Sequence, residues 1–198
     1  EIGLTFARAL RGFLRQDPDI IMVGEVRDLE TAEIAIQAAL TGHLVFSTLH
    51  TNDAAGAFTR LLDMGVEPYL VASTLEGVLA QRLVRIICPD CAETYIPNHL
   101  ELLQKEFGDD LPDEFRRGVG CEKCQGMGYL GRKGIFEHMT ITEEIREAIT
   151  ENATHAKIRS LAMENGMKNS LETLGEFGFI ERVSRGCLVR GYAVVKAI

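Results

Sequence analysis

Residues 17–53 read DPDIIMVGEVRDLETAEIAIQAALTGHLVFSTLHTND, and they decide the fold. Ile20 to Val23 is a short, mostly β-branched apolar run, which is typical of a strand buried on both faces. Asp28 then caps a helix that ends at Gly42. We expect its apolar face to consist of Leu29, Ala32, Ile36, Ala39 and Leu40. A second apolar run, Leu44 to Leu49, follows directly, so the stretch predicts a strand, a helix and a parallel strand.

Two side chains whose functional groups can take part in catalysis follow these two strands. Glu25 comes after Gly24 at the end of the first strand, and His50 closes the second. Parallel strands joined by a right-handed crossover put their carboxyl ends on one edge, where open α/β sheets bind ligands. We therefore expect Glu25 and His50 to face one crevice. Each residue taken alone is also compatible with a solvated loop acid or a helix cap.

Arginines form a second pattern. Arg8, Arg11 and Arg15 recur at spacings of three and four residues, which places them on one side of a helix that enters the first strand. Arg60 comes ten residues after His50. A solvated helix arginine remains an alternative for each of the four.

Two more helices are predicted after His50. Asp53 to Met64 is amphipathic, and Gly65 ends it. The next helix is expected to start at Glu67-Pro68 and to run to Arg85. Its expected apolar face consists of Tyr69, Leu70, Val71, Leu75, Val78 and Leu79. Leu83 to Ile87 would form the last strand of this layer.

Four cysteines form two CxxC pairs, Cys88 with Cys91 and Cys121 with Cys124. Two such pairs can supply a tetrahedral shell of four thiolates, which suits Zn²⁺ and leaves no open position for chemistry. The competing reading is two disulfides, but the fifth cysteine, Cys187, leaves an odd count. We therefore predict a structural zinc site.

The composition limits the classes of partner. The formal net charge is −8 and the sequence pI is about 5.2, which argues against extended binding to nucleic acid or to an anionic membrane surface. No apolar run approaches the length of a membrane span, and no leader segment is seen. We expect membrane contact only through partners.

Several of these stretches resemble the type II secretion and type IV pilus assembly ATPases, the GspE/PilB-like family. The similarity runs from Leu4 to about Gly166 and includes the GEVRD motif, the STLHTND motif and the VLAQRLVR segment. The resemblance implies a P-loop NTPase that binds ATP and Mg²⁺. Gly24 and Glu25 would be the Walker B element, and His50 would be the His box.

The resemblance also implies residue roles. Glu25 would polarise the attacking water or support Mg²⁺, and His50 would sense the γ-phosphate. Arg11 and Arg15 would lie near nucleotide, and Arg60 would act across a subunit boundary. Gln81 and Arg82 would face the nucleotide, although solvated positions are an equal alternative. These roles suit phosphoryl transfer, which depends on positioning and on charge stabilisation.

The expected fold is α/β: a partial RecA-like P-loop NTPase domain with a four-cysteine zinc subdomain and a small helical C-terminal domain. We expect domains at residues 1–87, 88–137 and 138–198. In the last of these, Thr142 and Thr154 would begin two helices, with the chain beyond Met167 left open. No Gly-Lys-Ser or Gly-Lys-Thr occurs in the 198 residues. We expect the phosphate-binding loop upstream in a longer protein, and no ATP hydrolysis by this chain alone.

By resemblance, the whole protein would be a cytoplasmic homohexamer at the bacterial inner membrane. It would couple ATP hydrolysis to inner-membrane platform proteins that secrete protein or assemble a pilus. One alternative is a non-catalytic, zinc-stabilised module that regulates such a motor. Another is a pilus-retraction motor, whose relatives generally lack the paired cysteines.

Overall fold

The computed structural model describes residues 5–98, 100–107, 115–168 and 189–197. They form two compact units. The first contains residues 5–81, 137–168 and 191–197, and the second contains the described residues from 82 to 136 and residues 189–190. This division differs from the three domains expected from the sequence, because the helices after residue 138 belong to the same unit as the first strands. Among the described residues, none of the helices has both the length and the apolar character needed to cross a bilayer.

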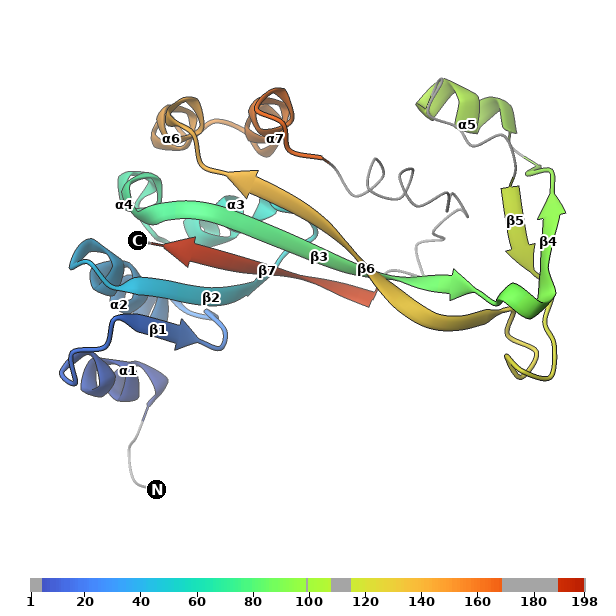
Figure 1. Ribbon diagram of the computed structural model, residues 1–198. Helices are drawn as coiled ribbons and strands as arrows, with labels where there is room; N and C mark the ends of the chain where they lie inside the picture. Colours follow the sequence, from blue (N-terminus) through green and yellow to red (C-terminus); the bar gives the residue numbers. More distant parts are fainter. Residues whose placement is uncertain (1–4, 99, 108–114, 169–188, 198) are drawn as a thin grey trace. The chain divides into compact units, whose positions relative to one another are not determined.

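The predicted strand, helix and parallel strand are confirmed. β1 (Ile20–Val23) pairs in parallel with β2 (Leu44–His50), and α2 (Leu29–Leu40) lies between them in sequence (Figure 1). The backbone N–H of Thr31 donates to Oδ1 of Asp28 at 2.8 Å, which caps α2 as expected. Gly42 has a φ of +95°, a left-handed conformation that ends the helix and is accessible to glycine at little cost.

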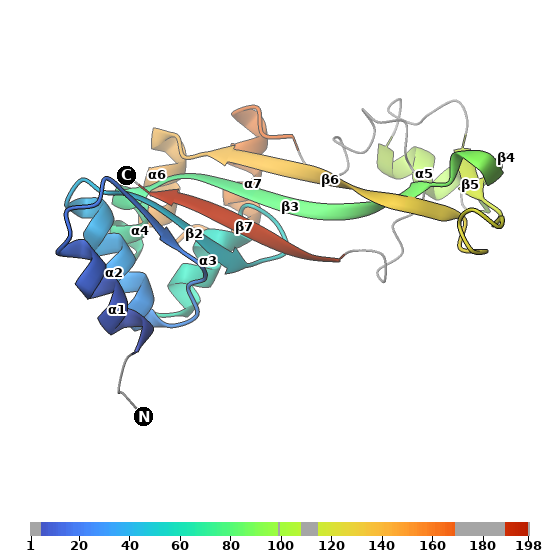
Figure 2. The same ribbon diagram turned by 60° about the horizontal axis from the view of Figure 1, so that its bottom comes forward.

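β1 is not buried on both faces, which corrects the prediction. Val23 is fully buried, but Ile20 and Met22 are 61% and 66% exposed. β1 is the first strand in the sheet order β1-β2-β7-β3-β6, and α2 and α1 (Phe6–Leu14) pack together beside it (Figure 2). Strand residues alternate between faces, so an apolar run alone cannot show whether one face or both are covered. Leu29 and Leu40, at the two ends of α2, are likewise more exposed than expected.

The core of the first unit is apolar and closely packed. α3 (Gly56–Asp63) and α4 (Pro68–Thr74) contribute Phe58 and Val71, both almost completely buried. α3 starts three residues later than the Asp53 expected from the sequence. The reason is local: Oδ1 of Asp53 accepts a hydrogen bond from the backbone N–H of Gly56 at 2.8 Å and so holds the turn before the helix.

The helix expected to continue from Glu67 to Arg85 is wrong beyond Thr74. The chain leaves α4 and forms β3 (Leu75–Ile87), so only the strand character of Leu83 to Ile87 was correct. The segment is rich in helix formers, which explains the prediction. In the sheet, however, β3 lies between β7 and β6 and has a hydrogen-bonding partner on each side. This pairing, with burial of Val78 and Ala80, outweighs the local preference.

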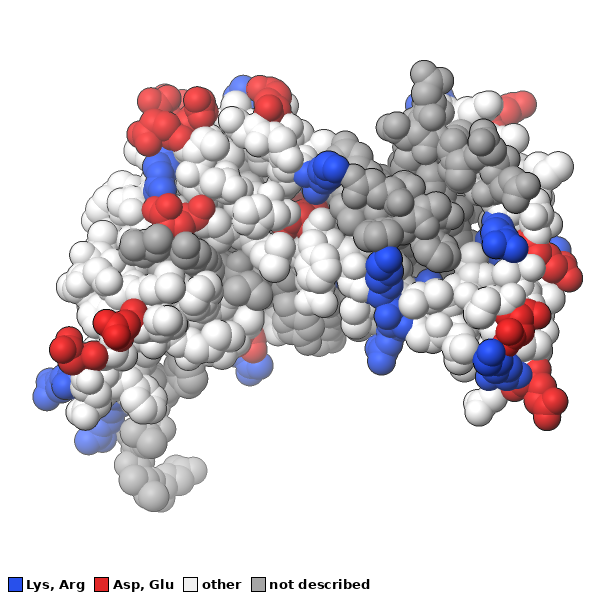
Figure 3. Space-filling model, viewed as in Figure 1, with Lys and Arg blue, Asp and Glu red and all other residues white. Residues whose placement is uncertain are grey.

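The two helices expected after residue 138 are confirmed. α6 (Glu143–Thr150) follows Thr142, and α7 (His155–Glu164) follows Thr154, whose hydroxyl accepts from the N–H of Lys157. Ile145, Ile149 and Ile158 are completely buried. The outer face of α6 carries acids, which form the red patch at the upper left of Figure 3, where Figure 1 places α6.

The described residues near the end of the chain, 189–197, form a strand rather than a helix. β6 (Tyr129–Thr140) precedes the two helices, and β7 (Val189–Ala197) is a strand antiparallel to β2. Most of the segment after Met167, including Cys187, lies outside the described residues.

The second unit is built around the cysteines and a small sheet. A short 3₁₀ turn, η1 (Pro89–Cys91), leads into β4 (Ala92–Tyr95), which pairs antiparallel with β5 (Phe115–Gly118). The rings of Tyr95 and Phe115 pack edge to face, with centroids 6.4 Å apart. A short helix, α5 (Leu100–Phe107), lies in sequence between the two cysteine pairs.

Candidate functional site

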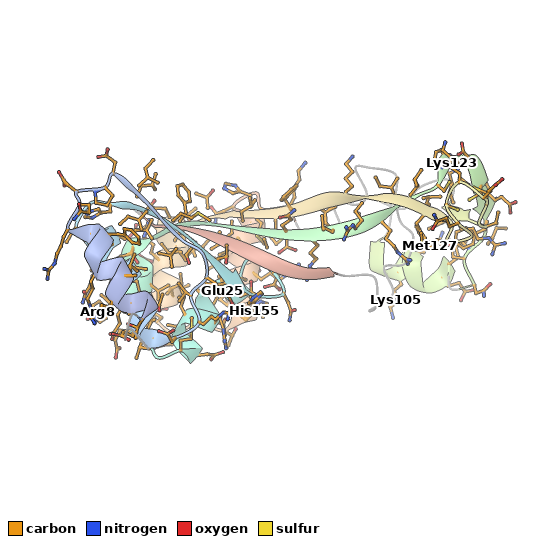
Figure 4. The ribbon with its side chains drawn as sticks, turned by 90° about the horizontal axis from the view of Figure 1, so that it is seen from below. Arg8, Glu25, Lys105, Lys123, Met127 and His155 are labelled. Carbon is orange, nitrogen blue, oxygen red and sulfur yellow. The ribbon has the colours of Figure 1, made fainter. Side chains whose placement is uncertain are left out.

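Glu25 and His50 meet at the edge where β1 and β2 end. The backbone N–H of Val26 donates to the carbonyl of Thr48 at 3.1 Å, and the Thr48 hydroxyl donates to the carbonyl of Gly24 at 2.5 Å. These bonds hold the turn after β1 against β2. Nε2 of His50 lies 2.9 Å from Oε1 of Glu25, whose position is shown in Figure 4. The expectation that both side chains share one rim is confirmed.

Arg27, which the sequence analysis did not single out, is the strongest partner of Glu25. Its Nε donates to Oε2 of Glu25 at 2.7 Å. This hydrogen bond holds the pKa of Glu25 below its usual value, helped by the charges of Arg27 and His50 and opposed by partial desolvation. The same contact raises the pKa of Arg27. Glu25 is therefore a carboxylate at neutral pH, suited to accept hydrogen bonds or to contact a cation.

The candidate arginines lie on exposed positions of two helices. Nη1 of Arg11 is 3.1 Å from Oε1 of Glu30, and both side chains are exposed, so the pair contributes about 0–1 kcal/mol. Arg15 follows α1 as its C-terminal cap and is exposed, and so is Arg60 on α3. Arg8 is exposed on α1 (Figure 4). The structure thus places Arg11, Arg15 and Arg60 where another molecule can reach them, and it pairs Arg11 with Glu30.

Gln81 and Arg82 lie in β3 rather than at a helix end. Both are half-buried. Gln81 is the last residue of the first unit in this part of the chain, and Arg82 is the first residue of the second. Their expected role toward nucleotide therefore stays a prediction.

A cluster of charged side chains was missed by the sequence analysis. Nε2 of His155 lies 2.9 Å from Oδ1 of Asp53. Arg159 contacts the same carboxylate, and Glu137 is buried beside them. Burial raises the pKa of Asp53, but hydrogen bonds from His155 and the N–H of Gly56 hold it below its usual value. Residues 53 and 159 are too far apart in sequence for any local pattern to pair them.

The four cysteines come together as predicted. The sulfurs of Cys88, Cys91, Cys121 and Cys124 all lie within 4.8 Å of one another. The pairs Cys88–Cys121 and Cys91–Cys124 are each 3.8 Å apart, and Cys121–Cys124 is 3.7 Å apart. A tetrahedral Zn²⁺ with Zn–S bonds of about 2.3 Å separates its sulfurs by about 3.8 Å, whereas a disulfide needs about 2.05 Å. The spacing fits four thiolates on one zinc ion and not two disulfides.

The backbone around the cysteines supports thiolates. The N–H groups of Cys121 and Gly128 both donate to Sγ of Cys124 at 3.2 Å. These bonds, led by that of Cys121, lower the pKa of the Cys124 thiol to about 6. Burial raises the pKa of Cys91 to about 12, which a bound cation would reverse. Lys123, labelled in Figure 4, pairs with Asp90 at 2.6 Å on the outside of the cluster.

Comparison with known sequences finds similar ATPases of secretion and pilus systems. The family described as Type II/IV secretion system protein matches residues 1–184. The chain is 48% identical over 188 residues to Type II secretion system ATPase E of Vibrio cholerae. The aligned residues make up 93% of this chain and 36% of that protein. The chain is 52% identical over 174 residues to Type IV pilus assembly ATPase PilB of Thermus thermophilus, with 87% and 20% covered. The chain spans about a third or less of these relatives.

Solved structures resemble the fold at lower identity. The pilus retraction motor PilT with bound ADP superposes with a TM-score of 0.50 at 27% identity, covering 90% of this chain and 44% of that one. The ATPase DotB of Legionella pneumophila superposes with a TM-score of 0.58 at 25% identity, covering 90% and 40%.

Proposed function

The chain belongs to the Type II/IV secretion system protein family, and on that premise we propose that it is the Walker B and His box part of an ATPase motor for type II secretion or type IV pilus assembly. Its α/β architecture is that of a partial RecA-like domain with a cysteine cluster. The single observation that carries the proposal is the 2.9 Å contact between Glu25 and His50 at the ends of two parallel strands. We further propose separate roles for residues 1–87, 88–137 and 138–198 as ATPase core, zinc-binding part and C-terminal part, although described residues of the first and last ranges pack into one compact unit.

Glu25 and His50 have complementary roles in this proposal. ATP supplies the phosphate that reacts, and Mg²⁺ supplies positive charge at the phosphate oxygens. Glu25 is anionic at neutral pH, so it orients the attacking water or contacts the cation, with Gly24 completing the Walker B turn. His50 holds Nε2 against Glu25, and a γ-phosphate at the same rim competes for that nitrogen. His50 therefore reports whether the γ-phosphate is present.

Arg27 has to move away from Glu25 when nucleotide and cation bind. It holds Oε2 of Glu25, the carboxylate that a cation or a water would contact. The side chain of Arg27 is mostly exposed, so it can swing into solvent at low cost. We infer that Arg27 neutralises Glu25 until nucleotide and cation bind.

The remaining residues act around the nucleotide. Exposed arginines at the ends and outer faces of helices suit a site that is completed between subunits of a ring. Arg11 and Arg15 would contact nucleotide, and Arg60 would reach the neighbouring subunit. Gln81 and Arg82 would approach the nucleotide from β3. The ring would be a homohexamer.

The phosphate-binding loop and the partners lie outside these 198 residues in this proposal. No Gly-Lys-Ser or Gly-Lys-Thr is present in them, so the chain alone would not hydrolyse ATP. The motor would be cytoplasmic and would act on platform proteins of the bacterial inner membrane. Cys88, Cys91, Cys121 and Cys124 would hold one structural Zn²⁺, which leaves no open position for catalysis.

The test uses a protein that joins this sequence to its phosphate-binding loop. Glu25→Gln should lower the rate of ATP hydrolysis by at least about 100-fold while a fluorescent ATP analogue still binds. The matched control is Glu33→Gln on the exposed face of α2, which should leave turnover unchanged. Unchanged turnover in Glu25→Gln would contradict the assignment. Absence of hydrolysis in the unmodified protein would favour the non-catalytic regulatory module.

A further inference from the structure

Three elements of the first unit meet at the loop that follows His50. Asp53 comes from this loop, Glu137 from β6, and His155 and Arg159 from α7, where Figure 4 labels His155. Oδ1 of Asp53 lies 2.9 Å from Nε2 of His155, and Nη1 of Arg159 donates to Oδ2 of Asp53 at 3.2 Å. Nη2 of Arg159 lies 3.9 Å from Oε1 of Glu137. One guanidinium therefore serves two carboxylates from different elements.

The same carboxylates hold the backbone of the loop. Oε2 of Glu137 accepts from the N–H of Ala54 at 3.1 Å, and Oδ1 of Asp53 accepts from the N–H of Gly56 at 2.8 Å. The hydroxyl of Thr51 donates to the carbonyl of Asp53 at 3.0 Å. Ala54 is fully buried, so its N–H cannot turn to water instead. The loop between His50 and α3 is thus fixed at successive positions.

Burial makes this arrangement depend on Arg159. Glu137 is only 2% exposed, and a buried carboxylate is costly unless a cation compensates it. Loss of Arg159 removes a cation shared by Glu137 and Asp53, and this favours movement of both carboxylates toward water. Both hold backbone groups of the loop, so the loop would move with them. His50 is three residues before Asp53, with no glycine between them.

We propose that Arg159 is a positioning residue that fixes the loop after His50 through Asp53 and Glu137, and so sets His50 against Glu25. The proposal rests on the function assigned to the Glu25–His50 pair. It makes α7 part of the apparatus that places the phosphate-sensing histidine. A displacement of α7 would move Arg159 and, through Asp53 and Glu137, would change the position of His50.

The first test is independent of ATP hydrolysis. Amide hydrogen exchange of the 198-residue chain should be at least about 10-fold faster at Ala54 and Gly56 in Arg159→Ala, with Val26 in the β1 turn unchanged. Arg159→Lys keeps the positive charge but lacks the two-pronged guanidinium, so its exchange rates should lie between those of the unmodified chain and of Arg159→Ala. Lys157→Ala, an exposed position on the same helix, should match the unmodified chain.

A second variant reaches the same loop from the other side. A Cβ at Gly56 would lie 3.1 Å from Oδ1 of Asp53, so Gly56→Ala presses on that carboxylate without touching α7. It should accelerate exchange at Ala54 selectively as well. Rates within twofold of the unmodified chain in Arg159→Ala would overturn the proposal. Equal acceleration at Val26 in both variants would also overturn it, because Arg159 would then act on global stability.

The second test measures steady-state ATP hydrolysis in the longer protein that carries the phosphate-binding loop. Arg159→Ala should lower kcat about 10-fold with KM for ATP within about twofold, and Arg159→Lys should restore part of kcat. A rise in KM at unchanged kcat would overturn the positioning role. If the unmodified protein hydrolyses no ATP but the exchange results hold, the proposed function fails and the loop assignment stands. If it hydrolyses ATP and Arg159→Ala is unaffected, the positioning role alone fails.

Discussion

Removing the metal assigned to the four cysteines should unfold the second unit and leave the first folded. The buried cluster of the second unit consists of the thiols of Cys88, Cys91 and Cys124, with Cys121 packed against them. The first unit has an extended apolar core instead. A structural Zn²⁺ contributes about 10–16 kcal/mol to the folding of small domains at neutral pH. A fully buried apolar side chain contributes about 1.5–3 kcal/mol, so the few in the second unit cannot replace the metal.

The assay is amide hydrogen exchange with and without a zinc chelator. The N–H of Cys88 donates to the carbonyl of Gly128 at 3.0 Å, and the N–H of Val119 donates to that of Cys91 at 3.1 Å, so both report on the cysteine cluster. Even a 3 kcal/mol loss corresponds to roughly 150-fold faster opening. We expect at least that change at both amides, and none at Val26, whose N–H donates to Thr48 in the first unit.

The control restores zinc and should restore slow exchange at Cys88 and Val119. Metal content has to be measured in the same samples. Slow exchange at both amides in protein with less than about 0.1 zinc per chain would contradict a structural role for zinc, because the second unit would then fold without the metal.

Three further outcomes follow from individual contacts. The pKa of Asp53 is depressed in the folded chain, so this carboxylate contributes fully to stability above the pKa that Asp53 has in the unfolded chain, and its contribution is lost as pH falls. The difference in urea midpoint between the unmodified chain and Asp53→Asn should therefore shrink below about pH 4. Gly118→Ala would put a Cβ 1.8 Å from the carbonyl oxygen of Gly128, so zinc per chain measured by atomic emission should fall, whereas Gly12→Ala, with open space around it, should keep its zinc. Phe58→Ala should lower the free energy of unfolding by about 3–5 kcal/mol in urea titration, and a loss below about 1 kcal/mol would contradict the packing around Phe58.

The sequence was sufficient where the signal is local. Asp28, Gly42 and the apolar runs on either side are short-range cues, and they located β1, α2 and β2 correctly. The rule that parallel strands share one carboxyl edge then correctly predicted that Glu25 and His50 lie together. The CxxC spacing worked for the same reason, since each pair of thiolates is set by one turn.

The sequence failed where distant segments decide the structure. Leu75 to Ile87 has the composition of a helix, but the pairing partners that make it a strand, β6 and β7, come more than 40 residues later. Arg159 is 106 residues from Asp53, and although Asp53 ends the STLHTND motif, nothing in the sequence links that motif to Arg159. The exposure of Ile20 and Met22 depends on what covers that face of β1, which a strand's own residues do not encode.

Glu25 and His50 are proposed to act together on one phosphate, and a double-mutant cycle on ATP hydrolysis measures whether they do. The four proteins are the unmodified chain joined to its phosphate-binding loop, Glu25→Gln, His50→Ala and the double variant. Because the two side chains are 2.9 Å apart and are assigned to the same phosphate, the double variant should lose no more than about threefold in kcat beyond Glu25→Gln. Multiplicative losses from the two substitutions would show that the residues act independently and would contradict the account.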